Sequence, residues 1–266
     1  MAKHPADHEL DFLKCCTKEE LTPIVAAVLG TKKKVDLEGR VIVRDGIEER
    51  EIDTKGRFSS SLDKRKVFKE NYPDHTKYVD ELIDEIQRYG GNSIFNAFRG
   101  HGVLYHDVLV DVANKQRVHF DKLQPTEEIE MSLLEKILEN VWEKMSDSQR
   151  QSVLDEAAKQ GFNVNGIGLV TLVAILEGGG VGYYWVLRFI TILIGRTLLG
   201  GGFVAGGSLV LMRFLGLLAG PIGWVVSGAW MALDCASPAY RVTIPATIYI
   251  AALRRIKLEQ KLHPEY

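Results

Sequence analysis

A run of polar side chains between residues 99 and 111 holds the residue types in this sequence that could do chemistry. This polar cluster consists of Arg99, His101, Tyr105, His106, Asp107 and Asp111. Asp107 and Asp111 are one helical turn apart, so on a helix their carboxylates share a face and could orient a cation or transfer protons. His101 and His106 could ligate a metal, but their spacing across a glycine is not a zinc pattern. We therefore predict a structural or binding role for the polar cluster, with no catalytic residue and no metal site.

Glycine-rich stretches are the second candidate, because glycine loops can cradle phosphates. Residues 178–182 and 200–207 are as rich in glycine as such loops, but no Lys-Ser or Lys-Thr stands where a P-loop requires it. The chain also lacks the acidic residue of a dinucleotide-binding unit, a nucleophile elbow and a Cys/His pair. We expect no cofactor and no enzymatic activity.

The net charge and the cysteine content indicate which partners and which cellular compartment to expect. The net charge is −2 and the front of the chain has no basic patch, which argues against nucleic acid as a partner. Cys15, Cys16 and Cys235 have neither the even number of a disulfide framework nor a metal-type spacing. The first residues lack the apolar stretch of a secretory signal. We expect an intracellular protein with reduced thiols.

Helix-start and helix-stop signals divide the first 162 residues, which we expect to form a charged, soluble helical domain. Thr17 and Glu20 are spaced as a capping box, and the helix that follows is predicted to end at Gly30. Residues 146–149 form a second capping box, before a helix that is predicted to end at Gly161.

Apolar periodicity predicts further helices. A stripe over residues 78–86 ends at glycines 90 and 91, and we expect helices over residues 11–16 and about 103–115. A long helix opens at Pro125 with two glutamates in its first turn. Its apolar face is predicted to consist of Ile129, Leu133, Leu134, Ile137, Leu138, Val141 and Trp142.

Residues 35–52 interrupt the helical pattern. The apolar run 41–43 and the segment from Ile47 to Ile52 flank an Arg-Asp-Gly sequence at residues 44–46. This arrangement predicts a small, solvent-exposed β-hairpin with an Asp-Gly turn.

Three blocks of sequence resemble the YaaW family of bacterial proteins. They are residues 10–21 (LDFLKCCTKEEL), residues 90–112 (GGNSIFNAFRGHGVLYHDVLVDV) and residues 239–255. The blocks span most of the chain in matching order, and the hairpin region resembles an insertion relative to members of that family. The front segment is also similar to a small domain found ahead of regions likened to ubiquinol-cytochrome c chaperones. The resemblance implies a fold but no activity. Together with the reduced thiols, it leads us to expect a protein of the bacterial cytoplasm.

Residues 163–266 are expected to form a glycine-rich apolar helical region that associates with a membrane. Only six charged side chains occur in residues 163–253. Three apolar segments of 13 to 19 residues, separated by glycine clusters, cover residues 181–199, 203–219 and 221–233. They are at or below the roughly 20 residues that a spanning helix needs, and arginines interrupt two of them, so they are not straightforward transmembrane helices. A C-terminal amphipathic helix with a basic end follows, beginning near residues 243–245.

Three physical arrangements fit these apolar segments. A helical hairpin could stay shielded in the bundle until a trigger releases it, or the segments could be permanently inserted with their arginines snorkelling. They could also form the core of a larger soluble fold. The residues predicted to contact membrane are Trp185, Phe189, Ile192, Phe203, Leu211, Phe214, Trp224 and Trp230. Small residues four apart, which let helices approach closely, are Gly178, Gly182, Gly202, Gly206, Gly216 and Gly220.

The sequence thus predicts a mainly α fold, with an N-terminal helical bundle, a small β-hairpin, an apolar helical region and an amphipathic C-terminal helix. The leading function hypothesis is a non-enzymatic protein associated with, or active on, the inner membrane, as a pore-forming or stress-response effector. Membrane lipid would be its partner, and the small-residue faces predict a homo-oligomer. The alternative hypothesis is a soluble, chaperone-like helical module that binds a protein partner.

Overall fold

Local sequence signals lead to a mainly helical chain in the computed structural model, which describes residues 6–44, 47–56, 60–90, 102–159, 161–162, 168–178, 180–199 and 239–262. The front helices are η1 (His8–Cys15), α1 (Lys18–Leu29), η2 (Leu62–Lys64), α2 (Lys66–Asn71), η3 (His75–Tyr78), α3 (Val79–Gly90), α4 (Tyr105–Lys115), α5 (Thr126–Lys144) and α6 (Asp147–Lys159). The later helices are α7 (Gly168–Gly178), α8 (Gly180–Leu199) and α11 (Tyr240–Leu262).

The predicted helix signals are confirmed at the atomic level. Before α1, the Thr17 hydroxyl accepts from the Glu20 N–H, and the Glu20 carboxylate accepts from the Thr17 N–H. Ser146 and Gln149 exchange the same pair of hydrogen bonds before α6. Gly30 and Gly161 follow their helices with positive φ, a conformation that glycine adopts without a steric penalty.

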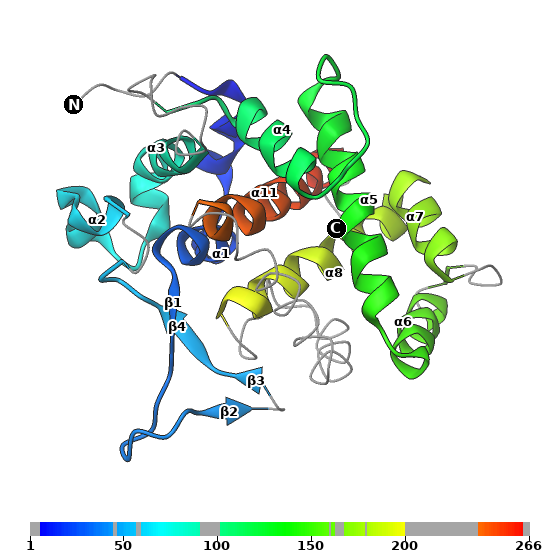
Figure 1. Cartoon of the computed structure of the whole chain (residues 1–266), viewed down its shortest axis with the longest axis horizontal. Helices are drawn as coiled ribbons and strands as arrows, with labels where there is room; N and C mark the ends of the chain where they lie inside the picture. The colour runs from blue at the N-terminus through cyan, green and yellow to red at the C-terminus, as the bar shows by residue number, and fades with distance from the viewer. Residues whose placement is uncertain are drawn as a thin grey trace.

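Helix α11 occupies the centre of the bundle (Figure 1). It packs against α8, α1, α5, α4 and α3, so helices from both halves of the chain surround it. Every residue from Val242 to Arg254 is buried, which is typical of a helix enclosed on all sides. The prediction of an amphipathic helix therefore describes only its last turns, where Leu262 is 72% exposed. The helix also begins at Tyr240, earlier than the expected start near Pro245.

One continuous hydrophobic core joins the front helices to α7, α8 and α11. It includes the whole predicted apolar face of α5, with Trp142 packed against it, and the stripe that ends at Ile86 on α3. Contacts of α11 and α8 with α1 thus cross the predicted domain boundary at residue 162, although the boundary itself stays a prediction.

The β-strands form an arm that extends away from the helices (Figure 1). Strands β2 (Val43–Arg44) and β3 (Ile47–Glu48) pair antiparallel, as the hairpin prediction expects. Strand β4 (Arg50–Ile52) pairs instead with β1 (Thr31–Lys33), with Thr31 opposite Ile52. Strand β1 was not predicted, because three residues after a helix carry no readable alternation.

Candidate functional site

The apolar helices α7 and α8 are the part of the described chain with the composition of a membrane segment. They pack against each other, and α8 also packs against α11 and α1. Among the described residues, no single helix is both long and apolar enough to span a bilayer. Residues 168–178 and 182–196 reach that length and composition only as a pair, with a bend of 110° between them.

The residues of α8 predicted to contact membrane are buried inside the protein. Trp185, Phe189 and Ile192 all belong to the interior of the bundle. Trp185 stacks on Phe189 with 6.3 Å between ring centroids, and Phe162 lies 6.0 Å from Trp185. In this conformation α8 is therefore covered by protein. Phe203, Leu211, Phe214, Trp224 and Trp230 lie outside the described residues.

Helix α7 is covered less completely than α8. Leu172 and Leu176 face the core, whereas Val170 is 64% exposed and Ala174 is also exposed. The pair therefore presents apolar surface at its α7 side and keeps α8 enclosed.

Arginines within α8 are also enclosed. Arg188 and Arg196 are both buried, and the Arg188 guanidinium lies over the Tyr184 ring at 5.9 Å from its centroid. The negative face of an aromatic ring attracts a guanidinium ion placed over it. Helix α8 thus carries positive charge into the bundle interior.

Gly182 lies close to side chains of neighbouring elements, whereas Gly178 does not. A Cβ at Gly182 would lie 2.7 Å from Ile175 Cγ2 and 2.9 Å from Phe162 Cε1. A Cβ at Gly178 would have no neighbour within 4 Å, because this last residue of α7 faces outward. Gly202, Gly206, Gly216 and Gly220 lie outside the described residues.

These two glycines give a matched test. We expect Gly182→Ala to destabilise the fold by about 1–3 kcal/mol through overpacking. We expect Gly178→Ala to be neutral or to stabilise by up to about 1 kcal/mol, because alanine favours helix. Urea unfolding followed by circular dichroism measures both, and equal effects would contradict the close packing of α7 on α8.

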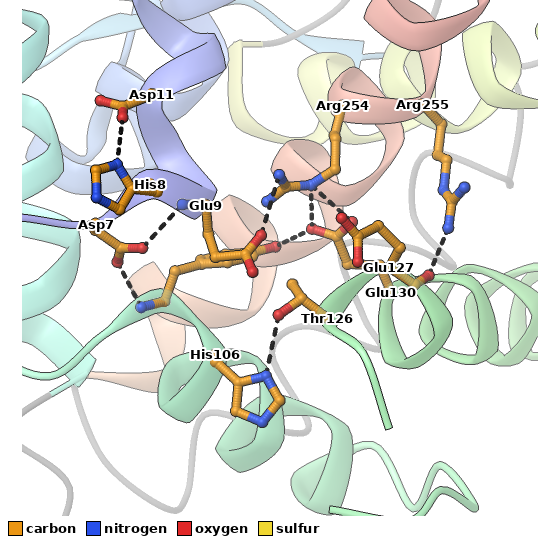
Figure 2. Close-up of polar contacts among 11 residues, drawn as sticks. Asp7, His8, Glu9, Asp11, His106, Thr126, Glu127, Glu130, Arg254 and Arg255 are labelled. Atoms are coloured by element: carbon orange, nitrogen blue, oxygen red, sulfur yellow. Dashed lines mark hydrogen bonds and ion pairs between the residues drawn. The ribbon is translucent and has the colours of Figure 1, made fainter. Parts of the chain in front are cut away.

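A buried ionic network fixes α11 to the front helices (Figure 2). Arg254 Nε of α11 donates to the Glu130 carboxylate of α5 at 2.9 Å, and Tyr105 of α4 donates to Glu130 Oε1 at 2.8 Å. Arg254 Nη1 lies 3.3 Å from the Glu9 carboxylate of η1. Its guanidinium also lies over the Phe12 and Tyr105 rings. This Arg254 network joins four elements that are far apart in the sequence.

The segment before η1 is attached to the same region. Asp7 Oδ2 accepts from the Tyr105 N–H at 2.6 Å and from Gln87 Nε2 at 3.2 Å. The Tyr105 N–H is at the start of α4, so a carboxylate here also suits the positive end of the helix. On the other side, the Arg255 guanidinium donates to the Glu127 carbonyl at 2.7 Å (Figure 2).

Burial sets the protonation behaviour of the Arg254 network. Burial raises the pKa of Glu130, while Arg254 and the Tyr105 hydroxyl act in the opposite direction. Burial also raises the pKa of Tyr105, and the nearby Glu130 adds to this effect. The tyrosine therefore stays a neutral donor, which suits a role in holding α4 against α5.

The polar cluster does not assemble into one site. Tyr105 belongs to the Arg254 network, and His106 Nδ1 lies 3.0 Å from Thr126 Oγ1 (Figure 2). Asp107 is exposed, whereas Asp111 accepts from the Tyr240 hydroxyl of α11 at 3.1 Å. Arg99 and His101 lie outside the described residues. Tyr105, His106 and Asp111 thus fasten α4 to its neighbours, and Asp107 does not. Within the described chain, no group of histidine, cysteine and carboxylate side chains is arranged to hold a metal.

A second buried carboxylate, Glu85 of α3, fastens the loop before η2. It accepts from the Ser61 N–H at 2.7 Å, from the Ser61 hydroxyl at 2.8 Å and from the Ser60 hydroxyl at 3.0 Å. Arg88 donates to it as well. Burial alone would raise the pKa of Glu85, but the hydrogen bonds from Arg88 and Ser61 outweigh burial and lower it.

The amino-acid sequence is similar to those of known bacterial proteins. The chain is 35% identical over 256 residues to a UPF0174 protein of Helicobacter pylori strain J99, covering 96% of this chain and 93% of that protein. The chain belongs to the UPF0174 family. The UPF0174 protein YaaW of Escherichia coli K12 is 30% identical over 94% of both chains, which confirms the predicted YaaW resemblance. A shorter UPF0174 protein of Helicobacter pylori strain 26695 is 36% identical over 71% of this chain. No family model and no solved structure matches.

The UPF0174 name states no activity. Sequence reasoning missed the Arg254 network, although two signals for it exist. Glu130 lies one turn after Thr126 on the buried face of an otherwise apolar stripe, and Arg254 ends a long uncharged run. A charge on an apolar face indicates a buried partner, because an unpaired charge there is strongly disfavoured.

Proposed function

We propose that this UPF0174 protein is a non-enzymatic, membrane-active protein in which the α7–α8 pair enters a lipid bilayer after release from the helical bundle. The proposal depends on one observation. The described helix pair with the length and composition of a membrane segment is bent by 110°, and its second helix, α8, is packed against α11 and α1. That is the arrangement of a segment shielded from lipid.

Two further features support it. Val170 and Ala174 give α7 an exposed apolar edge that can meet a bilayer before α8 is uncovered. The buried arginines of α8 would face a polar path or the headgroups after insertion, as arginines in membrane helices do. Lipid is the partner that this chemistry fits.

The experiment places an environment-sensitive fluorophore on α7. The three cysteines are replaced by alanine, and a single cysteine is introduced by Val170→Cys for labelling. A matched control, Leu123→Cys, labels a residue that is 92% exposed in the connection between α4 and α5. The labelled full chain is mixed with vesicles of phosphatidylethanolamine and phosphatidylglycerol, at neutral pH and at about pH 5.

We expect the Val170 label to shift to an apolar spectrum and to be quenched by brominated lipid, while the Leu123 label does neither. Flotation of the protein with the vesicles should accompany the shift. If the protein stays with the aqueous fraction at both pH values and after Arg254→Ala, the membrane function is wrong. The alternative, a soluble module in which α8 is simply core, then accounts for the burial of Trp185 and Phe189.

A further inference from the structure

His75 is a buried histidine at the junction of α1, α2 and η3. Its side chain is in the interior, and 2% of the residue is exposed. Its Nδ1 shares a hydrogen bond with the Tyr78 hydroxyl, and its ring lies 5.7 Å from the Tyr78 ring and 6.0 Å from the Tyr72 ring. Phe68 of α2 completes this aromatic cluster at 5.1 Å from Tyr78. Three aromatic rings provide an apolar pocket that favours a neutral imidazole.

The charges around His75 come from α1 and from its own turn. Lys18 of α1 opposes an imidazolium ion, whereas Glu19 of α1 and the neighbouring Asp74 favour one. Tyr72 and Tyr78 also face the ring, and burial raises the pKa of both, so they remain neutral. Burial is the largest effect on His75 and, with Lys18, lowers its pKa to about 4.

The lowered pKa of His75 determines how the stability of this region changes with pH. An exposed histidine has a pKa of about 6.5, so protons bind the opened state more readily than the closed state below that pH. The stability that His75 contributes is present above about pH 6.5. It is lost as the pH falls toward 4, where the closed state also protonates.

The turn that holds His75, η3, packs on helix α1. It also packs against α2 and the following helix α3, and α1 in turn packs against α8 and α11. The buried face of α1 includes Ile24, Val25 and Val28. Removal of η3 would therefore uncover part of α1, a helix that itself packs against α8 and α11.

We propose that residues 62–78 form an acid-sensitive cap on α1, and that protonation of His75 releases this cap and begins the opening that frees α8. The link to α8 rests on the proposed membrane function; the cap itself does not.

The other buried groups confine the acid response to this side of the bundle. Glu85, with its lowered pKa, loses its stabilising effect as the pH falls, and it holds the residues that precede the cap. Glu130, with its raised pKa, binds a proton more readily in the folded state, so its titration does not lower the stability of the fold as the pH falls. Opening in acid should thus start at η3 and α2 and leave α5 and α11 closed.

Hydrogen exchange on the full chain without lipid tests the cap directly. Between pH 7 and pH 5, after correction for the intrinsic exchange rate, amides of η3 and α2 should exchange about 20-fold faster. His75→Gln keeps a hydrogen-bonding group and should abolish most of this increase, whereas His119→Gln at an exposed position should preserve it. An equal increase in His75→Gln, or none in the unaltered protein, overturns the proposal.

Two readouts keep the outcomes distinct. If His75→Gln does not fold, a nuclear magnetic resonance titration of the unaltered protein decides: a His75 pKa below about 5 supports the cap, and an ordinary value near 6.5 overturns it. If the cap opens in acid while vesicles stay free of protein, the membrane function fails and the cap stands. If vesicles bind equally at both pH values and exchange in residues 62–78 is unchanged, the cap fails and the membrane function stands.

Discussion

Replacing Arg254 with alanine is expected to lower the free energy of unfolding by about 3–5 kcal/mol, because the change leaves a buried carboxylate without its counter-ion. Glu130 is 0% exposed and accepts from Arg254 at 2.9 Å. The guanidinium also fills the space over the Phe12 and Tyr105 rings, so packing is lost together with charge. Equilibrium unfolding in urea, with the exchange of α11 amides as a second measure, gives the magnitude.

The adjacent arginine provides the control. Arg255→Ala removes the same charge from the same helix but breaks a hydrogen bond to the Glu127 carbonyl, with an expected loss of about 1–2 kcal/mol. The double variant Arg254→Met, Glu130→Leu replaces both ions by apolar groups of similar size and should recover most of the lost stability. A loss at Arg254 no larger than that at Arg255 would show that the buried ion pair does not fasten α11.

The second large effect is expected at Glu85. Glu85→Ala should cost about 3 kcal/mol, because three donors from Ser60 and Ser61, and Arg88 with them, lose their acceptor in the interior. Its sequence neighbour Asp84 pairs with Arg65 at a partly exposed position, so Asp84→Ala should cost less than about 1 kcal/mol. Thermal unfolding at neutral pH compares the two.

The pH dependence of Glu85→Ala adds an independent check. Since the pKa of Glu85 is lowered, its contribution is present above the ordinary carboxyl range and is lost as the pH falls through the folded-state value. The difference between the unaltered protein and Glu85→Ala should therefore shrink in acid. A difference that is constant over the same pH range would assign the effect of the substitution to packing alone.

Local features of this fold could be predicted from sequence, and tertiary pairings could not. The capping box at Thr17 and the helix stop at Gly30 depend on residues a few positions apart, so the chain specifies them directly. The contact of Glu130 with Arg254 spans 124 residues, and no periodic pattern carries that information. For the same reason, the sequence indicated an apolar α8 but not that Trp185, Phe189 and Ile192 face protein.

The central helix was interpreted as amphipathic with a basic end. That end consists of Arg254, Arg255, Lys257 and Lys261, yet the first of them is buried and paired. Lys257 likewise reaches Glu20, the same residue that closes the capping box of α1, at 2.7 Å. A basic helix end therefore has two physical meanings, solvent exposure or internal pairing, and only the positions of the carboxylates on other helices decide between them.

The central position of α11 has a consequence for how the chain folds during synthesis. The helices α1, α3, α4 and α5 emerge from the ribosome long before residues 240–262, yet each of them packs on α11. Until that stretch is translated, their apolar faces have no complete partner, and such exposed surface is prone to aggregation. Closure of the core is thus a late event in translation. A nascent chain halted before residue 240 should bind a ribosome-associated chaperone more strongly than a chain extended past residue 262.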